Sequence, residues 1–242
     1  MVLDTINSPN CIIPAPAQKM YVHSSKPIAH NLTNVLVERE MQHDIKEYYE
    51  KHHNIRPKVL HDIDWDASKK ALATKSEISY RKTFHNLRNT MSVNKKWKRA
   101  ESDLCPMCAK EPETLHHLLS CTHDDIKYVR NLSIAKFTQT LKKLNTQPDI
   151  VSHWTQLLER VTTNQPIKSP TLSMTNPSSW RLIQAHQQQT GIGWGCFFKG
   201  MLGKKWTMIQ QSHYNGNQKD GENIHRWKRI VLRMFFDMMK DL

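Results

Sequence analysis

Apolar residues recur at intervals of three or four positions along most of the chain. Residues at that spacing share one face of an α-helix, so the pattern predicts a mainly α protein. One helix is predicted over about 34–54, and a second begins at Trp65 with Asp64 as its N-cap. A third begins at about Glu77 and carries Tyr80, Phe84, Leu87 and Met91 on its apolar stripe. Further helical stripes lie over about 126–144, 150–161, 180–187, 197–201, 206–214 and 224–238. Asn176 and Pro177 are expected to form the N-cap and first position of the helix that passes through Trp180, and Gly191 is expected to stop it. Residues 191–194 are expected to form a turn.

Two proline-rich stretches without helical periodicity divide the chain. Residues 1–30 predict a loosely attached arm, and residues 162–179, with three prolines among Ser, Thr and Asn, predict a linker. We therefore expect a helical region over residues 31–161 and a separate, Trp-rich helical region over residues 180–242. Aromatic residues at helical spacing are usually core residues, so the tryptophans are expected to be mostly structural.

Three of the five cysteines lie within seventeen residues, in a segment that spans residues 104–123. Cys105 and Cys108 form a Cys-x2-Cys turn, in which Pro106 presets the backbone, and Cys121 follows after two histidines. Three thiolates and one imidazole are a typical ligand set for structural zinc. The spacing predicts a zinc knuckle that binds Zn2+.

Two histidines compete for the fourth ligand position. On a helix that is capped near Thr114, His117 and Cys121 lie at i and i+4 on one face, whereas His116 lies about 140° from Cys121. The expected ligands are therefore Cys105, Cys108, His117 and Cys121, with His116 as the alternative to His117. Cys11 and Cys196 are about 185 residues apart, which is not a disulfide framework, so we expect an intracellular protein of the nucleus or cytoplasm.

The charge balance narrows the class of partner. The formal net charge is +13, which favours an acidic partner such as nucleic acid. No apolar run reaches the eighteen residues of a membrane helix, so no membrane partner is expected. All seven glycines lie at or after position 191, which excludes a P-loop or a dinucleotide fingerprint upstream, and no small-molecule substrate is expected.

The cations concentrate just before the cysteine segment. Between Lys69 and Arg99 there are ten Lys or Arg residues and one acid, Glu77. Trp97 lies among them, and cations around an aromatic residue are typical of single-strand binders. The predicted nucleic-acid contacts are Arg81, Lys82, Arg88, Lys95, Lys96, Trp97, Lys98 and Arg99.

The cysteine segment resembles the zinc-binding segment that follows the reverse transcriptase in eukaryotic retroelement polyproteins. The resemblance rests on Cys105-Pro106-Met107-Cys108, then Glu113-Thr114, then His117-Leu118-Leu119-Ser120-Cys121, with weaker similarity over about residues 30–240. The chain lacks the Tyr-x-Asp-Asp motif of the polymerase. Gln147-Pro148-Asp149 imitates the opening of the nuclease found in some related elements, but the next acid, Glu159, comes too early.

Together these features predict a non-catalytic, zinc-knuckle segment of a retroelement-type protein that binds RNA or DNA with little sequence preference. A polymerase or another retroelement protein is a further expected partner. The alternative is a protein-interaction or scaffold module, in which the zinc is purely structural and the Trp-rich helices dock another subunit. Salt dependence separates the two, because phosphate contacts weaken steeply as the salt concentration rises.

Overall fold

The computed structural model describes residues 22–23, 26–27, 44–73, 78–85, 87–170, 177–217 and 223–242 of the chain. Its contacts divide the chain into two compact units, residues 1–48 and residues 49–242. The first unit contains a short antiparallel hairpin of β1 (Val22–His23) and β2 (Lys26–Pro27), in which Val22 pairs with Pro27. The rest of the predicted arm, and the part of the predicted first helix that precedes residue 44, lie outside the described residues.

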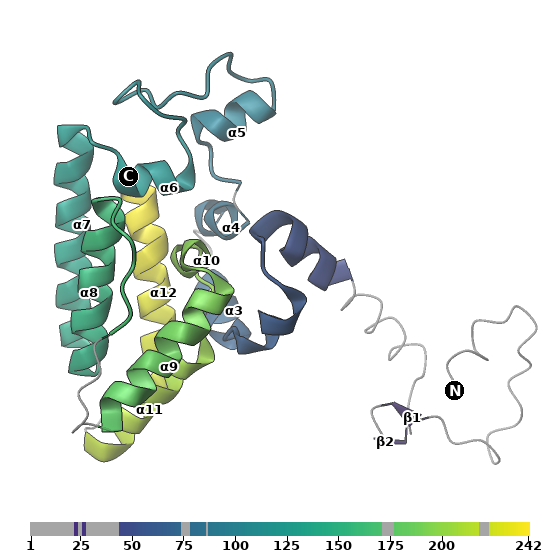
Figure 1. Cartoon of the computed structure of the whole chain (residues 1–242), viewed down its shortest axis with the longest axis vertical. Coiled ribbons are helices and arrows are strands. Elements are labelled where there is room, and N and C mark those ends of the chain that lie inside the picture. Colours follow the sequence, from purple (N-terminus) through teal and green to yellow (C-terminus); the bar gives the residue numbers. More distant parts are fainter. Residues whose placement is uncertain are drawn as a thin grey trace, which may run out of the picture. The chain divides into compact units, whose positions relative to one another are not determined.

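The second unit is helical, as the sequence predicts (Figure 1). After the end of a helix over residues 44–53, its elements are the 3-10 helix η1 (Pro57–Asp62), α3 (Trp65–Leu72), α4 (Ile78–Phe84), α5 (Met91–Lys96), α6 (Leu115–Ser120), α7 (Asp124–Lys143), α8 (Pro148–Thr162), α9 (Pro177–Ile192), α10 (Trp194–Phe198), α11 (Lys204–Asn217) and α12 (Ile224–Asp241). None of the described helices is both long enough and apolar enough to cross a membrane.

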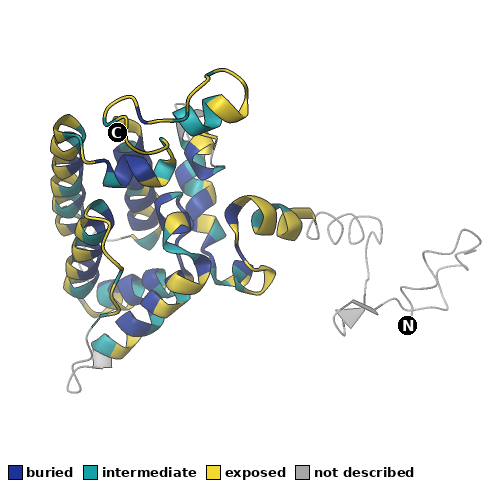
Figure 2. Cartoon of the chain, turned by 45° about the horizontal axis from the view of Figure 1, so that its top comes forward, coloured by how far each residue is buried: buried dark blue, intermediate teal, exposed yellow. Residues whose placement is uncertain are grey.

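Helix α12 lies at the centre of the second unit, between α7 on one side and α3 and α4 on the other (Figure 1). Its buried residues form two adjacent stripes that together cover about half of the helix surface: Trp227, Lys228, Val231, Leu232, Phe235, Phe236, Met238 and Met239. Such a wide apolar face can contact several helices at once, and α12 packs against α3, α4, α6, α7, α10 and α11. In Figure 2 the dark blue, buried stretches of the ribbon lie mainly where the helices pack together, and the exposed yellow stretches lie toward the outside.

The expected separation of the C-terminal region is wrong. Trp206 and Trp227, which follow the predicted linker, are fully buried together with Phe137 and Trp154, which precede it. The Trp154 ring lies 5.4 Å from that of Trp206 and 5.9 Å from that of Trp227, between ring centroids. Residues 180–242 therefore complete the core of the same unit, because α7 packs against α12 and the Trp154 ring of α8 contacts Trp227 and Phe235 of α12.

Two helix boundaries in the structure differ from the predicted ones. The helix expected from Glu77 to Met91 ends at Phe84, and Thr90 caps a new helix, α5, by accepting a hydrogen bond from the backbone N–H of Val93 at 3.4 Å. Leu87, expected on the apolar stripe, is 45% exposed. Similarly, α9 continues through Gly191 to Ile192, and the chain leaves the helix at Gly193. Gly193 has a φ of 102°, a backbone conformation that residues with a side chain rarely adopt.

Candidate metal centre

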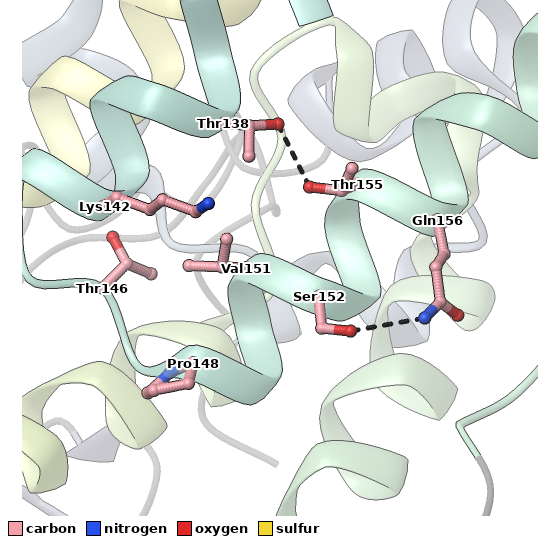
Figure 3. Close-up of a pocket in the computed structure, with 8 residues that line it drawn as sticks. All are labelled: Thr138, Lys142, Thr146, Pro148, Val151, Ser152, Thr155 and Gln156. Carbon is pink, nitrogen blue, oxygen red and sulfur yellow. Dashed lines mark hydrogen bonds between the residues drawn. The ribbon is translucent and has the colours of Figure 1, made fainter. Parts of the chain in front are cut away.

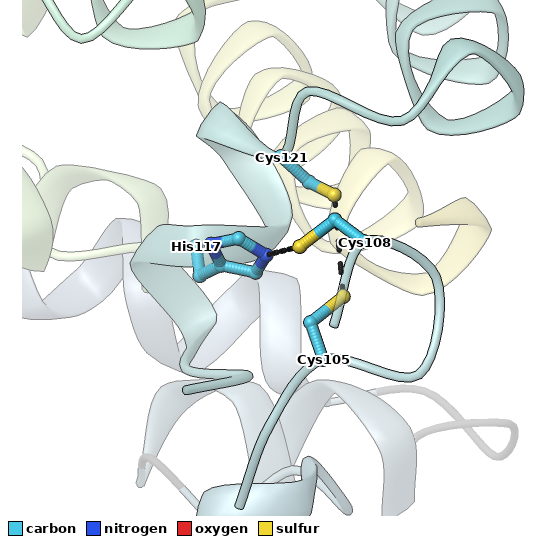
Figure 4. Close-up of side chains that lie close together, drawn as sticks. All are labelled: Cys105, Cys108, His117 and Cys121. Atoms are coloured by element: carbon cyan, nitrogen blue, oxygen red, sulfur yellow. Dashed lines mark hydrogen bonds between the residues drawn. The ribbon is translucent and has the colours of Figure 1, made fainter. Parts of the chain in front are cut away.

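Four side chains converge at one point in the second unit: Cys105, Cys108, His117 and Cys121 (Figure 4). Their potential ligand atoms all lie within 4.8 Å of one another. Cys105, His117 and Cys121 are buried, and Cys108 is half-buried. These are the four residues that the sequence predicts as metal ligands, and the cluster could hold a metal ion.

A tight hairpin places the first two thiols. The backbone N–H of Cys105 donates to the carbonyl of Glu111 at 2.8 Å, and the N–H of Ala109 donates back to the carbonyl of Cys105 at 2.8 Å. Ala109 adopts a positive φ of 51°, which reverses the chain just after Cys108. The sulfur atoms of Cys105 and Cys108 lie together with the side chains of His117 and Cys121 (Figure 4).

The short helix α6 supplies the other two groups. Thr114 caps this helix through a 3.0 Å hydrogen bond from the backbone N–H of His117 to its hydroxyl oxygen. His117 then points inward and Cys121 follows at the end of the helix, while His116 is exposed. The choice of His117 over His116 as the residue that joins the cluster is confirmed.

Two charged residues that spacing arguments did not identify support the cluster. The Glu111 carboxylate lies 3.1 Å from His117 Nδ1, where it accepts a hydrogen bond from the Nδ1–H group. The unprotonated Nε2 then faces the thiols, 3.3 Å from Cys108 Sγ. The buried Arg130 guanidinium donates to the carbonyl oxygen of Cys121 at 3.0 Å. Glu111 and Arg130 reach the cluster from the hairpin and from α7, respectively.

The thiols of Cys108 and Cys121 differ in pKa. Backbone N–H groups of Lys110 and Glu111 point at the Cys108 sulfur and lower the pKa of this thiol to about 6. Burial raises the pKa of Cys121 to about 11, so without a cation this thiol stays protonated at neutral pH. A cation in the cluster would stabilise both thiolates.

The cluster is tied directly to the basic helix α5. The Glu113 carboxylate accepts a hydrogen bond from the backbone N–H of Met91 at 2.6 Å, at the start of α5. The N–H of Ser92 donates to the carbonyl of Glu113 at 3.3 Å, and Lys95 pairs with Asp103 at 2.9 Å. The position of α5 therefore depends on the hairpin that the cluster organises.

The predicted nucleic-acid residues at the end of α5 are exposed. Trp97 is 41% exposed, and the Arg99 guanidinium lies over its ring, 4.8 Å from the centroid. Lys96 and Lys98 are exposed on either side of Trp97 in the sequence. Lys98 has a positive φ of 56°, which turns the chain back at the end of the helix and groups these side chains.

The remaining predicted contacts divide into two groups. Arg81 and Lys82 are exposed on α4. Arg88 and Lys95 are already partnered, because Arg88 donates to the carbonyl of Lys240 at 3.2 Å and Lys95 pairs with Asp103. Burial lowers the pKa of the Arg88 guanidinium, which is consistent with a residue that fastens its loop to α12. Arg88 and Lys95 therefore already have partners within the folded chain.

A hollow of about 590 Å³ lies between α7 and α8, away from the predicted site residues (Figure 3). Its eight lining residues include one charged side chain, Lys142, and several hydroxyl groups. Two of those hydroxyls, from Thr138 and Thr155, bond to each other at 3.1 Å, and Ser152 accepts from Gln156 at 3.3 Å. This lining offers neither an acid–base pair nor a set of metal ligands.

The chain was also compared with known proteins. No protein-family model, no curated protein and no solved structure matches it.

Proposed function

We propose that Cys105, Cys108, His117 and Cys121 bind one Zn2+ ion. In a tetrahedral zinc site the distance between two thiolate sulfurs is about 3.8 Å and that between sulfur and imidazole nitrogen about 3.6 Å, given Zn–S and Zn–N bonds of about 2.3 and 2.05 Å. The corresponding distances are 4.0 Å between Cys105 and Cys121 and 3.3 Å between Cys108 and His117. Soft thiolates with one imidazole favour zinc over magnesium or calcium.

A site with four protein ligands has no open position for a reacting water molecule, so the proposed role of the metal is structural. Three thiolates around Zn2+ leave one net negative charge, and the buried Arg130 beside Cys121 is placed to compensate for it. We propose accordingly that the chain binds ligands and does not catalyse a reaction. The metal would fix the hairpin, and the hairpin would hold α5.

We further propose that the end of α5 binds single-stranded RNA or DNA with little sequence preference. The observation that carries this proposal is the exposed Trp97 ring with Arg99 over it, between exposed Lys96 and Lys98. A base can stack on the free face of the indole or on the guanidinium, while the lysines pair with phosphates. Arg81 and Lys82 of α4 would add further phosphate contacts.

The resemblance of the cysteine segment to the zinc-binding segment of retroelement polyproteins supports the same proposal. A segment that follows a reverse transcriptase works beside a nucleic-acid template, and a metal-stabilised basic module suits that position. We propose that the chain is the zinc-knuckle segment of a retroelement-type protein, with a polymerase or another retroelement protein as a further partner.

A salt titration tests nucleic-acid binding. With about five phosphate contacts, the affinity of the metal-loaded chain for a labelled single strand should fall with the logarithm of salt concentration at a slope of roughly −3 to −5. The triple variant Lys96→Ala, Lys98→Ala, Arg99→Ala should bind more weakly and lower the slope by about 2 to 3. Fluorescence anisotropy at four or more salt concentrations measures both quantities.

The matched control removes three exposed lysines of α7, in the variant Lys136→Ala, Lys142→Ala, Lys143→Ala. It loses the same charge and should keep most of the slope. Trp97→Ala should cost about 1–3 kcal/mol of binding free energy on a single strand and less on a duplex. Equal effects of the α5 triple variant and the α7 control would show that only net charge matters and would reject this site.

The rival function, a docking module built on the C-terminal tryptophans, has less support. Trp206 and Trp227 are fully buried in the core, so neither can meet a partner. Among the described tryptophans after the linker, Trp180 is the most exposed, at 54%. Salt-insensitive capture of a protein partner that is lost on Trp180→Ala would favour this alternative.

A further inference from the structure

A second basic site lies between α3 and the first half of α12, where a pocket has a volume of about 410 Å³. None of the residues proposed for zinc or for the end of α5 lines it. Its lining contains Lys70, Arg226, Arg229 and Arg233, together with His225, Ala73 and Asn223. Among the lining residues that the structure describes there is no carboxylate. Four permanent cations therefore share one concave surface.

The geometry of α12 explains why these arginines gather there. At 100° per residue, Arg226, Arg229 and Arg233 fall within about 60° of one another, on the side of the helix opposite its buried stripes. The neighbouring cation Lys228 is buried, with its ammonium 2.9 Å from the Asp64 carboxylate and 3.4 Å from that of Asp66. Helix α12 thus separates one structural cation from three that face the pocket.

The described counter-charges near the pocket are few. The Asp66 carboxylate pairs with Lys70 at 3.0 Å and with Lys228 at 3.4 Å, and it lies 3.6 Å from His225 Nδ1. Arg233 donates to the carbonyl of Ala71 at 3.5 Å. Over the described ranges, neither Arg226 nor Arg229 forms an ion pair. The positive end of the eighteen-residue helix α12 adds to the same field.

Such a concentration of like charges attracts an anion, because the hollow focuses the field of all four cations. Guanidinium groups bind phosphate through two parallel hydrogen bonds, and several of them can grip adjacent phosphates. Phe, Tyr and Trp are absent from the described lining, which consists mainly of cationic side chains that suit phosphate. We propose that this pocket binds two or more adjacent phosphate groups, and that Arg226 and Arg229 are its principal contacts.

The proposal does not depend on the proposed function of α5, and inorganic pyrophosphate is the direct probe. Calorimetric titration of the full chain in phosphate-free buffer at low salt should give saturable binding of one pyrophosphate per chain. The variant Arg226→Ala, Arg229→Ala should weaken this binding about ten-fold or more, because each lost charge-assisted hydrogen bond is worth roughly one such factor. Both residues are exposed, so the thermal unfolding midpoint should not change.

Two further variants distinguish specific binding in the pocket from a general effect of net charge. Lys136→Ala, Lys143→Ala removes the same charge from the exposed surface of α7 and should change pyrophosphate affinity by less than about two-fold, since salt screens distant charges. The variant Arg226→Lys, Arg229→Lys keeps the charge but loses the bidentate geometry of the guanidinium groups. It should therefore bind pyrophosphate more weakly than the native chain. Absence of binding, equal losses in the α7 variant, or native affinity in the lysine variant would each overturn the proposal.

The source of the phosphates is decided with a labelled oligothymidine strand in the Lys96→Ala, Lys98→Ala, Arg99→Ala background. If residual strand binding falls further on Arg226→Ala, Arg229→Ala, the pocket contacts a nucleic-acid backbone. If only pyrophosphate binding falls, the ligand is a small polyphosphate. Failure of the α5 proposal would leave the pyrophosphate result unchanged, so the two proposals fail separately.

Discussion

At the scale of single residues, the cluster separates two histidines that are adjacent in the sequence. His117 is buried with Nε2 facing Cys108, whereas His116 is exposed. His117→Ala should therefore release zinc to a chromophoric chelator at a much lower chelator concentration than the native chain does, while His116→Ala should behave like the native chain. Equal losses in the two variants would reject the proposed ligand set.

Glu111 should tune the same site without binding the metal. Its carboxylate holds the proton on His117 Nδ1, and loss of such a partner typically lowers metal affinity 10- to 100-fold. We expect Glu111→Ala to weaken zinc binding by about that factor in the chelator competition. Glu101→Ala removes an exposed carboxylate elsewhere in the same loop and should have little effect. A native-like affinity of Glu111→Ala would show that the contact does not orient the ligand.

At the scale of elements, the connection between α10 and α11 depends on one glycine. Gly200 has a φ of +87°, and a Cβ at this position would lie 2.5 Å from Phe236 Cζ in the buried face of α12. Gly200→Ala combines backbone strain of about 1–2 kcal/mol with overpacking of about 1–3 kcal/mol. It should lower the free energy of unfolding by about 2–5 kcal/mol in urea titrations.

Gly195 provides the matched control for Gly200. It lies in the short helix α10, is exposed, and a Cβ there would meet nothing within 4 Å. Gly195→Ala should leave stability unchanged or raise it by up to about 1 kcal/mol, because alanine favours a helix. A similar loss in both variants would mean that neither Phe236 nor the positive φ determines the cost.

At the scale of the whole molecule, buried histidines make stability depend on pH. His153 and His186 are buried in contact, with Nε2 of the first 3.1 Å from Nδ1 of the second. Burial lowers the pKa of both, and that of His153 to about 4, from an ordinary value of 6.5. The unfolded chain therefore binds protons at a higher pH than the folded chain, so stability is full above pH 6.5 and declines as the pH falls toward 4.

For His153 alone this loss amounts to about 2 kcal/mol at pH 5. Urea unfolding at pH 7.5 and at pH 5 measures it, and the same pair of titrations on chelator-treated protein separates it from protonation of the metal ligands. His153→Gln can still form a hydrogen bond with His186 but does not titrate, so it should show a smaller loss between the two pH values. Identical losses in the native chain and the variant would contradict this origin.

Features that depend on groups a few residues apart could be predicted from local spacing alone. The Cys-x2-Cys turn, the caps at Asp64 and Thr114 and the choice of His117 all follow from local spacing, because a cap joins groups within three residues and a helix places i and i+4 on one face. The periodicity of α8 and α12 likewise predicted their buried faces. Zinc itself and the bound nucleic acid stay predictions.

Which helices pack together, and which charged side chains lack a partner, depends on contacts between residues far apart in the sequence. Residues 180–242 complete the core of residues 49–161, although a proline-rich stretch suggested a boundary, because burial depends on the helix that lies opposite. Arg88 and Lys95 were predicted from the sequence to contact nucleic acid, but both interact with other residues of the folded chain. Conversely, the sequence pattern did not predict a basic pocket around Arg229, since this pocket forms only where α3 packs against α12.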